Sequence, residues 1–308
     1  MGARMTFGLG LNVHESVGDV ARKSIVAEAL GFDYVWISDS PSQLYGPIVG
    51  AVVAAKTSKI KIGLGVMSPF LHSPKQIGAT LNTLVDAYGP RFELCIGPGD
   101  RMQLEHVGIH LIRGEKLTSK MAAARKEIAS LLKKADCLEK IWLGAQGPMM
   151  LKIAKTFDGV LINFSKPEMI EWAIREVDVA RNTEIGVYVT SYAYSTLNPN
   201  IRKLAKVPAA VVALGASDSV LKRFGLYSKL RNARKLAEVA PNLEKILNQV
   251  PGEVMDEFSI SMRISQLPTY LTQLKRLGVS HVVFGYPQNS SLQTVKELGR
   301  TIRKLREI

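Results

Sequence analysis

Two carboxylates follow short apolar runs in the N-terminal third of the chain. Asp39 comes at the end of the run 34–38, and Asp100 follows the run 92–96 within the turn 97–100, Gly-Pro-Gly-Asp. A carboxylate at a strand end can accept a hydrogen bond from a ring nitrogen or a hydroxyl of a bound ligand. Each also fits a plainer role, Asp39 as a helix cap or a salt-bridge partner and Asp100 as a helix cap after a tight turn. The glycines beside Asp100 allow a flat ligand to approach the backbone closely.

A second set of polar positions could bind an anion. The segment 144–148, Gly-Ala-Gln-Gly-Pro, follows the apolar run 140–143 and opens a predicted helix. Free backbone N–H groups and the positive end of a helix dipole would face a phosphate there. An ordinary turn between strand and helix has the same composition, so both interpretations stay open. Asn163 closes the run 160–163 and is either a ligand contact or a satisfied turn amide.

Other reactive side chains lack the spacing that their chemistry needs. His106 and His110 are four residues apart like a metal pair, but a glycine separates them and no third ligand is evident, so no metal is predicted. Cys95 lies inside an apolar run, which is typical of a buried inert thiol, and Cys137 has no C-x-x-C partner. The nucleophile-elbow, P-loop and kinase motifs are missing. Hydrolase and phosphotransferase interpretations therefore have no support.

The elements that must position these residues alternate between β-rich runs and amphipathic stretches of helical period. Eight such repeats predict an α/β fold, a (β/α)₈ TIM barrel, in which the active site forms at the carboxyl ends of the strands. Strands are predicted at 6–13, 34–38, 60–66, 92–96, 140–143, 160–163, 184–194 and 281–284. Helices are predicted at 16–30, 47–56, 74–88, 119–134, 148–156, 167–180 and 291–306.

We expect residues 1–308 to form a single barrel domain with a helical insertion. Such barrels typically have about 250 residues, and the surplus here lies at about 198–267, between the seventh and eighth predicted strands. The pattern predicts several helices and no strand in this insertion. A doubly wound sheet is the structural alternative, but the segment 8–10, Gly-Leu-Gly, lacks the third glycine of the dinucleotide fingerprint.

Composition favours a soluble cytoplasmic protein that attracts anionic ligands. The 308 residues are 46% hydrophobic and 22% charged, and 40 Lys and Arg against 27 Asp and Glu give a net charge of +13. Basic residues are dispersed, without zinc-finger spacing or an RNA-binding motif, so a small anion is favoured over nucleic acid. No apolar run reaches the roughly 18 residues of a membrane span, and the start has no signal-peptide layout.

Four segments in register resemble the methylenetetrahydromethanopterin reductases, an archaeal branch of the bacterial-luciferase-like barrels. The segments are 31–39 (Gly-Phe-Asp-Tyr-Val-Trp-Ile-Ser-Asp), 97–100 (Gly-Pro-Gly-Asp), 143–148 (Leu-Gly-Ala-Gln-Gly-Pro) and 158–163 (Asp-Gly-Val-Leu-Ile-Asn). The resemblance implies the deazaflavin coenzyme F420 in place of FMN, a pterin substrate, and a homo-oligomer. It also implies hydride transfer between that coenzyme and the methylene carbon of tetrahydromethanopterin.

The resemblance further implies roles for individual residues. A non-prolyl cis peptide between Gly65 and Val66 would back the deazaflavin ring, and Asp100 would be the polar group nearest the reacting carbon. The other residues implied to bind the coenzyme either border its ring (Asp39, Met67, Ser68, Gly97, Pro98 and Gly99), hold its phosphate (Ala145, Gln146 and Gly147) or complete the site (Asn163).

The chain departs from this family at two places, which leaves alternatives open. Gly10 stands where the methanogen reductases have a glutamate thought to serve the proton step, and His14 or Glu15 could replace it. The stretch 259–268 also lacks the family's Gly- and Pro-marked helix start. The alternatives are an FMN-dependent monooxygenase of the same superfamily and a non-catalytic protein that binds deazaflavin or pterin. A basic barrel that binds RNA is the least favoured.

Overall fold

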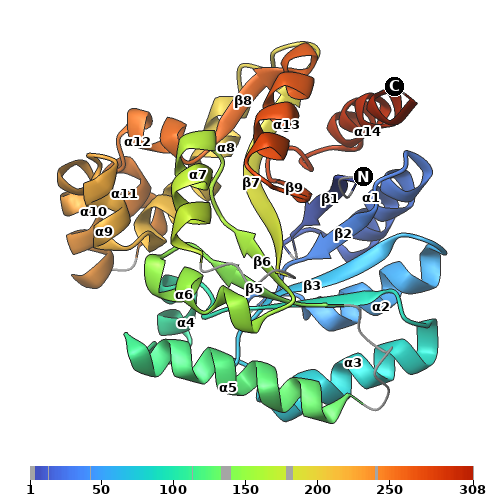
Figure 1. The fold of residues 1–308 in the computed structure, drawn as a ribbon. Helices are drawn as coiled ribbons and strands as arrows, with labels where there is room; N and C mark the ends of the chain where they lie inside the picture. The colour runs from blue at the N-terminus through green and yellow to red at the C-terminus, as the bar shows by residue number, and fades with distance from the viewer. Residues whose placement is uncertain are drawn as a thin grey trace.

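Eight parallel strands close into a barrel in the computed structural model (Figure 1), which describes residues 4–12, 14–41, 43–112, 114–132, 140–177, 183–239 and 242–307. Pairing between β6 and β7 closes the ring, so the predicted (β/α)₈ barrel is confirmed. The barrel strands, in spatial order, are β1 (Thr6–Leu11), β2 (Tyr34–Ile37), β3 (Lys61–Met67), β4 (Phe92–Ile96), β5 (Ile141–Ala145), β6 (Gly159–Ile162), β7 (Glu184–Tyr194) and β9 (His281–Gly285).

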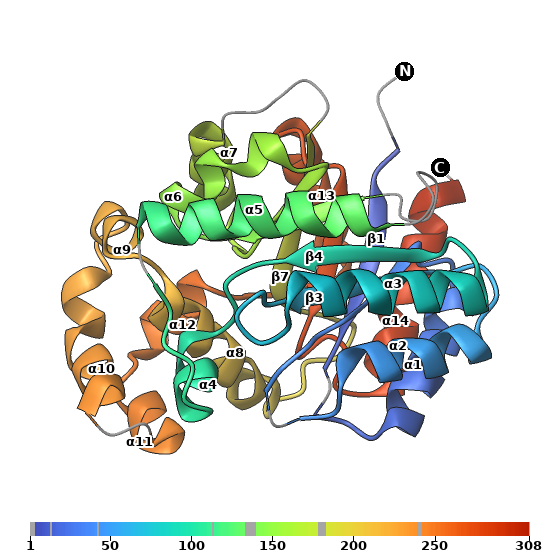
Figure 2. The same cartoon turned by 90° about the horizontal axis from the view of Figure 1, so that it is seen from below.

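Helices follow the strands and cover the outside of the barrel (Figure 2). The first and last helices lie side by side, where the Arg303 guanidinium donates a hydrogen bond to the Ala29 carbonyl. No helix among the described residues has the length and apolar character needed to cross a membrane. The outer helices are α1 (Val17–Ala29), α2 (Gly46–Lys56), α3 (Pro74–Tyr88), α5 (Glu115–Leu131), α6 (Pro148–Lys152), α7 (Pro167–Glu176), α13 (Leu267–Arg276) and α14 (Leu292–Glu307), with 3₁₀ turns at Ala154–Thr156 and Ile264–Gln266. The short helix α4 (Arg101–His106) lies at the carboxyl ends of the strands instead.

Local sequence signals account for several of these boundaries. Helix α3 begins with a capping box between Ser73 and Gln76, has Pro74 in its first turn, and ends at Gly89, whose φ is +80°. The short helix α4 was not predicted, and α5 begins four residues before the predicted start at 119. The predicted ends at 13, 134 and 180 lie outside the described residues.

The insertion between β7 and α13 contains five α-helices and one strand within its described residues, and its helices project from one side of the barrel (Figure 1). The expectation of no strand was wrong, because β8 (Ile260–Arg263) pairs in parallel with the last four residues of β7. Those residues extend beyond the pairing with β9, which ends at Thr190, so their backbone groups need another partner. The helices are α8 (Ile201–Gly215), α9 (Asp218–Arg223), α10 (Tyr227–Val239), α11 (Leu243–Asn248) and α12 (Gly252–Glu257).

Alternation along the strands separates two apolar layers. In β2, Val35 and Ile37 join the core between barrel and helices, whereas Tyr34 and Trp36 belong to a separate cluster inside the barrel. Aromatic rings fill this interior beside strand glycines. A Cβ at Gly159 would lie 2.6 Å from Cζ3 of Trp142. The buried members of the interior cluster are Tyr34, Trp36, Cys95, Trp142, Leu161 and Val283.

A buried carboxylate anchors this interior near the amino ends of the strands. Glu93 is 1% exposed and accepts hydrogen bonds from the Tyr34 hydroxyl (2.8 Å) and the Trp142 indole N–H (2.6 Å). The Lys61 ammonium lies 4.0 Å away, and burial raises the pKa of the Glu93 carboxyl. Because the chemistry of such barrels occurs at the opposite end, this network serves stability.

Replacing Glu93 by glutamine should therefore lower the free energy of unfolding by about 2 kcal/mol or more. The amide keeps the size of the side chain but puts a second donor against Tyr34 or Trp142. Urea unfolding at pH 7.5 measures the loss, with Glu257→Gln on the exposed end of α12 as the matched control. Equal stability of the two variants would contradict the assigned role of Glu93.

Candidate functional site

A pocket of about 200 Å³ opens at the carboxyl ends of β1 to β4. This is the end of the barrel where the sequence placed the site, and five of the predicted site residues border it: Asp39, Val66, Ser68, Gly99 and Asp100. The remaining lining residues are Asn12, His14, Ser38, Ser40, Pro41, Leu71, Gln103 and Leu104.

The floor of the pocket is a bulge near the end of β3. The peptide between Gly65 and Val66 is cis, as the resemblance implied, and the register with β4 shifts between Gly65 and Met67. A side chain at Gly97 would collide with Val66, since its Cβ would lie 2.8 Å from Cγ1. The Met67 side chain is buried in the core, so its predicted contact with a ligand is limited to the backbone.

The end of β4 is fixed to this bulge by hydrogen bonds. The Ser68 hydroxyl donates to the Pro98 carbonyl at 2.7 Å, and the Gly97 N–H donates to the Met67 carbonyl at 3.3 Å. Gly99 has a φ of +87°, a conformation that glycine adopts without strain. These contacts fix the backbone of residues 97–99 beside the bulge, where Gly99 borders the pocket and Gly97 and Pro98 do not.

Asp100 combines the two roles that the sequence left open. Its carboxylate caps α4 by accepting a hydrogen bond from the Gln103 N–H at 2.9 Å, and it also lines the pocket. Burial raises the pKa of the Asp100 carboxyl, while the N–H groups of Gln103 and Met102 oppose this shift. The raised pKa extends the pH range in which Asp100 can hold a proton at the pocket.

Asp39 is paired with a histidine that the sequence analysis did not identify. The His72 Nε2 atom lies 2.7 Å from Oδ2 of Asp39, and the Gly46 N–H donates to Oδ1 at 3.3 Å. The Asp39 side chain is only 3% exposed, so this carboxylate depends on both donors. His72 lies five residues beyond β3, and its position at a strand end was the available signal.

Removing the imidazole should leave a buried carboxylate with one donor fewer. We expect His72→Ala to lower the free energy of unfolding by about 1–3 kcal/mol, whereas His110→Ala, at an exposed histidine, should change it little. Adding Asp39→Asn to His72→Ala should recover part of the loss, because the neutral amide is less costly to bury. Urea unfolding of the unmodified protein, His72→Ala, Asp39→Asn and the double variant gives the coupling energy, and strictly additive effects would rule out the dyad.

The predicted phosphate-binding residues at the end of β5, and the predicted coenzyme contact Asn163 after β6, lie apart from this pocket. The Gln146 amide donates a hydrogen bond to the Val212 carbonyl of α8 at 2.8 Å, and so joins the barrel to the insertion. The Asn163 N–H donates to the Ala145 carbonyl at 3.1 Å. Gly147 faces Ser217, whose Oγ would lie 3.7 Å from a Cβ at that glycine. None of these four predicted residues borders the pocket.

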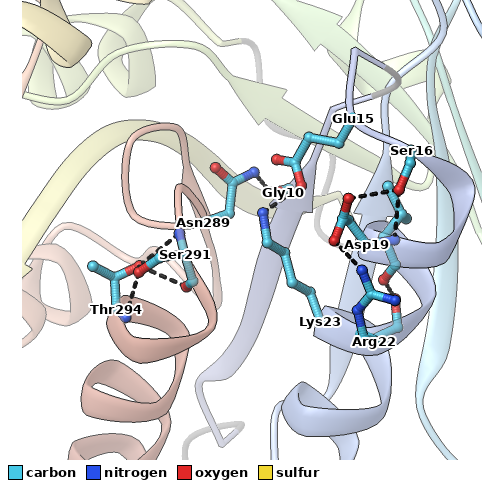
Figure 3. A network of polar contacts seen from close by, with 11 residues as sticks. Gly10, Glu15, Ser16, Asp19, Arg22, Lys23, Asn289, Ser291 and Thr294 are labelled. Atoms are coloured by element: carbon cyan, nitrogen blue, oxygen red, sulfur yellow. Dashed lines mark hydrogen bonds and ion pairs between the residues drawn. The ribbon is translucent and has the colours of Figure 1, made fainter.

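Gly10 contacts a polar side chain from near the end of the chain. Asn289 donates a hydrogen bond to the Gly10 carbonyl, and nearby Lys23 pairs with Glu15 (Figure 3). Glu15 is therefore held by an ammonium, whereas His14 lines the pocket. On the interior side, a Cβ at Gly10 would overlap the hydroxyl of Tyr188 and lie 2.6 Å from its Cζ. Tyr188 thus occupies the space that a side chain at position 10 would need.

The remaining reactive groups within the described residues do not gather into a metal-binding cluster. Among the described residues, no three His, Cys, Asp or Glu side chains are placed to hold a metal ion. Burial raises the pKa of the Cys95 thiol, which agrees with the inert role predicted for it. Cys137 lies outside the described residues.

Comparisons with known proteins give related sequences and a related structure. Residues 5–116 match the family described as luciferase-like monooxygenase. A 5,10-methylenetetrahydromethanopterin reductase from Archaeoglobus fulgidus is 30% identical over 85% of this chain and 87% of its own length. One from Methanolobus tindarius is 28% identical over 97% and 99%. The coenzyme F420-dependent tetrahydromethanopterin reductase structure from Methanopyrus kandleri matches with a TM-score of 0.80 at 22% identity, covering 97% and 98%.

Proposed function

Because the chain belongs to the 5,10-methylenetetrahydromethanopterin reductase family, we propose that it transfers a hydride between reduced coenzyme F420 and methylenetetrahydromethanopterin. The observation that carries this proposal is the 30% identity to the Archaeoglobus fulgidus reductase over most of both chains. The pocket supports it independently, since the carboxylates of Asp39 and Asp100 border a space at the catalytic end of the barrel together with Gly99.

The described residues fit a flat heteroaromatic coenzyme. The pocket volume of about 200 Å³ is below the roughly 300–1,000 Å³ of sites for whole drug-sized ligands, so it suits a ring system with its tail outside. Asp39, Ser68 and Asp100 offer polar contacts to ring edges. The residues proposed to border the ring are Asp39, Gly65, Val66, Met67, Ser68, Gly97, Pro98 and Gly99. Those proposed for the phosphate are Ala145, Gln146 and Gly147, and Asn163 is proposed to complete the site.

The bound coenzyme supplies the hydride, and the protein supplies position, exclusion of water and control of a proton. Reduction of the methylene bridge forms one C–H bond and breaks one C–N bond, and the released nitrogen takes up a proton. Asp100 is the residue proposed to hold that proton, because burial raises the pKa of its carboxyl. The net charge of +13 suits ligands that carry phosphate and carboxylate groups.

We also propose that the protein forms a homo-oligomer, with the exposed face of α2 as the contact between subunits. This helix is apolar nearly all round, and Ile48 is 61% exposed, with Leu44 and Tyr45 exposed beside it. A second copy of the chain would cover these side chains. Light scattering should give a mass above the 33.8 kDa of one chain, and Ile48→Glu should reduce it.

A cytoplasmic location remains a prediction from the sequence.

An anaerobic assay tests the proposed function. Reduced coenzyme F420 and methylenetetrahydromethanopterin are mixed with the protein, and coenzyme oxidation and methyl product are measured together. Equal amounts of both support the reductase. Binding of the coenzyme without product would favour a binding protein. Binding of FMN alone, with oxygen consumed in air, would favour the monooxygenase that the match over residues 5–116 allows.

A further inference from the structure

Tyr188 lies across the mouth of the barrel, over the ends of two strands. It belongs to β7, and its ring passes Gly285 at the end of β9 and reaches Gly10 near the end of β1. A Cβ at Gly285 would lie 2.5 Å from Cε1 of Tyr188, and one at Gly10 would lie 2.6 Å from Cζ. Two glycines on adjacent strands therefore make room for this one side chain.

The hydroxyl at the tip of this ring is available to a ligand. The Tyr188 side chain is partly buried, and the described part of the chain gives its hydroxyl no hydrogen-bond partner. Burial raises the pKa of Tyr188 to about 12, so the group stays a neutral O–H donor at neutral and mildly alkaline pH. The Tyr188 hydroxyl can therefore donate a hydrogen bond only to a ligand or a water molecule that enters the mouth of the barrel.

Tyr188 and the pocket floor belong to the same layer. Val66 and Tyr188 are the partly buried residues that pack on the interior cluster containing Trp36 and Trp142. Val66 lines the pocket over β1 to β4, whereas Tyr188 reaches the mouth from β7 and does not line that pocket. The residues proposed to border the coenzyme ring come from β2, β3 and β4 and the segments that follow them, so Tyr188 faces the other side of the mouth.

We propose that Tyr188 is a substrate-contacting residue whose hydroxyl donates a hydrogen bond to an acceptor on the pterin ring system. The inference rests on the proposed function and extends it, because it assigns the β7–β9–β1 side of the mouth to the substrate. Gly10 and Gly285 are then the residues that permit this contact, since any side chain at either position displaces the phenol.

Tyr188→Phe tests the contact because it removes one oxygen and keeps the ring that packs on the interior cluster. Tyr194→Phe, farther along β7, is the matched control. We expect kcat/KM for the pterin to fall at least tenfold. Calorimetry should show that the Kd for pterin binding to the protein with oxidised coenzyme bound rises by a similar factor. The Kd of the coenzyme itself should change less than twofold. Gly10→Ala should weaken pterin binding in the same direction, because its Cβ displaces the ring.

The outcomes separate this inference from the proposed function. If the unmodified protein turns over the pterin and Tyr188→Phe has the same kinetics and pterin affinity, the inference is wrong but the proposed function is supported. A loss of coenzyme affinity in place of pterin affinity overturns the assignment of this side to the substrate. If the unmodified protein binds coenzyme but neither binds nor reduces the pterin, the function and the inference fall together.

Discussion

Replacing Asp100 by asparagine should lower kcat by about 10²- to 10⁴-fold, the range expected when a positioned acid is lost. The amide has no titratable proton, yet asparagine is as good a helix cap as aspartate, so α4 and the pocket should keep their shape. The Kd of the coenzyme should consequently stay within a few-fold. Stopped-flow oxidation of the reduced coenzyme by the pterin measures the chemical step directly.

The pH dependence of kcat gives a second readout of the same residue. Burial raises the pKa of the Asp100 carboxyl, so its protonated form persists to higher pH than in an ordinary aspartate. A reaction that needs this form should slow as pH rises through that pKa, and the variant should lack this limb. Asp256→Asn, on the exposed side of α12, is the control. Full activity in Asp100→Asn would reduce Asp100 to a helix cap.

The strand ends could be predicted from the sequence because apolar runs and polar termini are local signals. Phe92–Ile96 and Glu184–Tyr194 have the predicted bounds, and Asp39 and Asp100 border one pocket as expected from the barrel. Strand β8 could not be predicted, because four residues carry too little periodicity to indicate a strand. Its existence depends on the length by which β7 extends past β9.

The orientation of side chains near the cis peptide was not accessible from the sequence. Leu64 packs in the outer core, and strict alternation would place Val66 on the same side and Met67 inside the barrel. The bulge at Gly65 reverses this order, so Val66 faces the interior and Met67 the outer core. The sequence did not identify Tyr188, because only the fold brings it to Gly10. The place of His72 after β3 was a signal for a site residue, but its pairing with Asp39 depends on the fold.

We expect His281 to make the stability of the folded protein fall as the pH is lowered. His281 is fully buried at the start of β9, and its Nε2 accepts a hydrogen bond from the Trp36 indole N–H at 2.8 Å. Since indole only donates, the ring proton must be on Nδ1, which lies 2.8 Å from the Thr6 hydroxyl. A second proton on Nε2 would face the N–H of Trp36. Burial, together with Lys140 and Lys61, lowers the pKa of His281 to about 3.

The sign of the effect follows from linkage. The unfolded chain takes up a proton at His281 below the ordinary pKa of 6.5, whereas the folded protein does not. Stability from this group is therefore complete above pH 6.5 and is lost by about 1.4 kcal/mol per pH unit as the pH falls toward 3. Between pH 6.5 and 5 the loss is about 2 kcal/mol.

Urea unfolding at pH 7.5, 6.5 and 5 should resolve this contribution. His281→Gln keeps an acceptor for Trp36 but cannot be protonated, so it should be less stable than the unmodified protein at pH 7.5 and lose less on acidification. Glu93, whose pKa burial raises, acts in the opposite direction, with stability lost as the pH rises. That contribution is present in both proteins and cancels in their difference. Equal slopes for the two proteins would mean that His281 is protonated inside the barrel, and the tautomer assigned from Trp36 would be wrong.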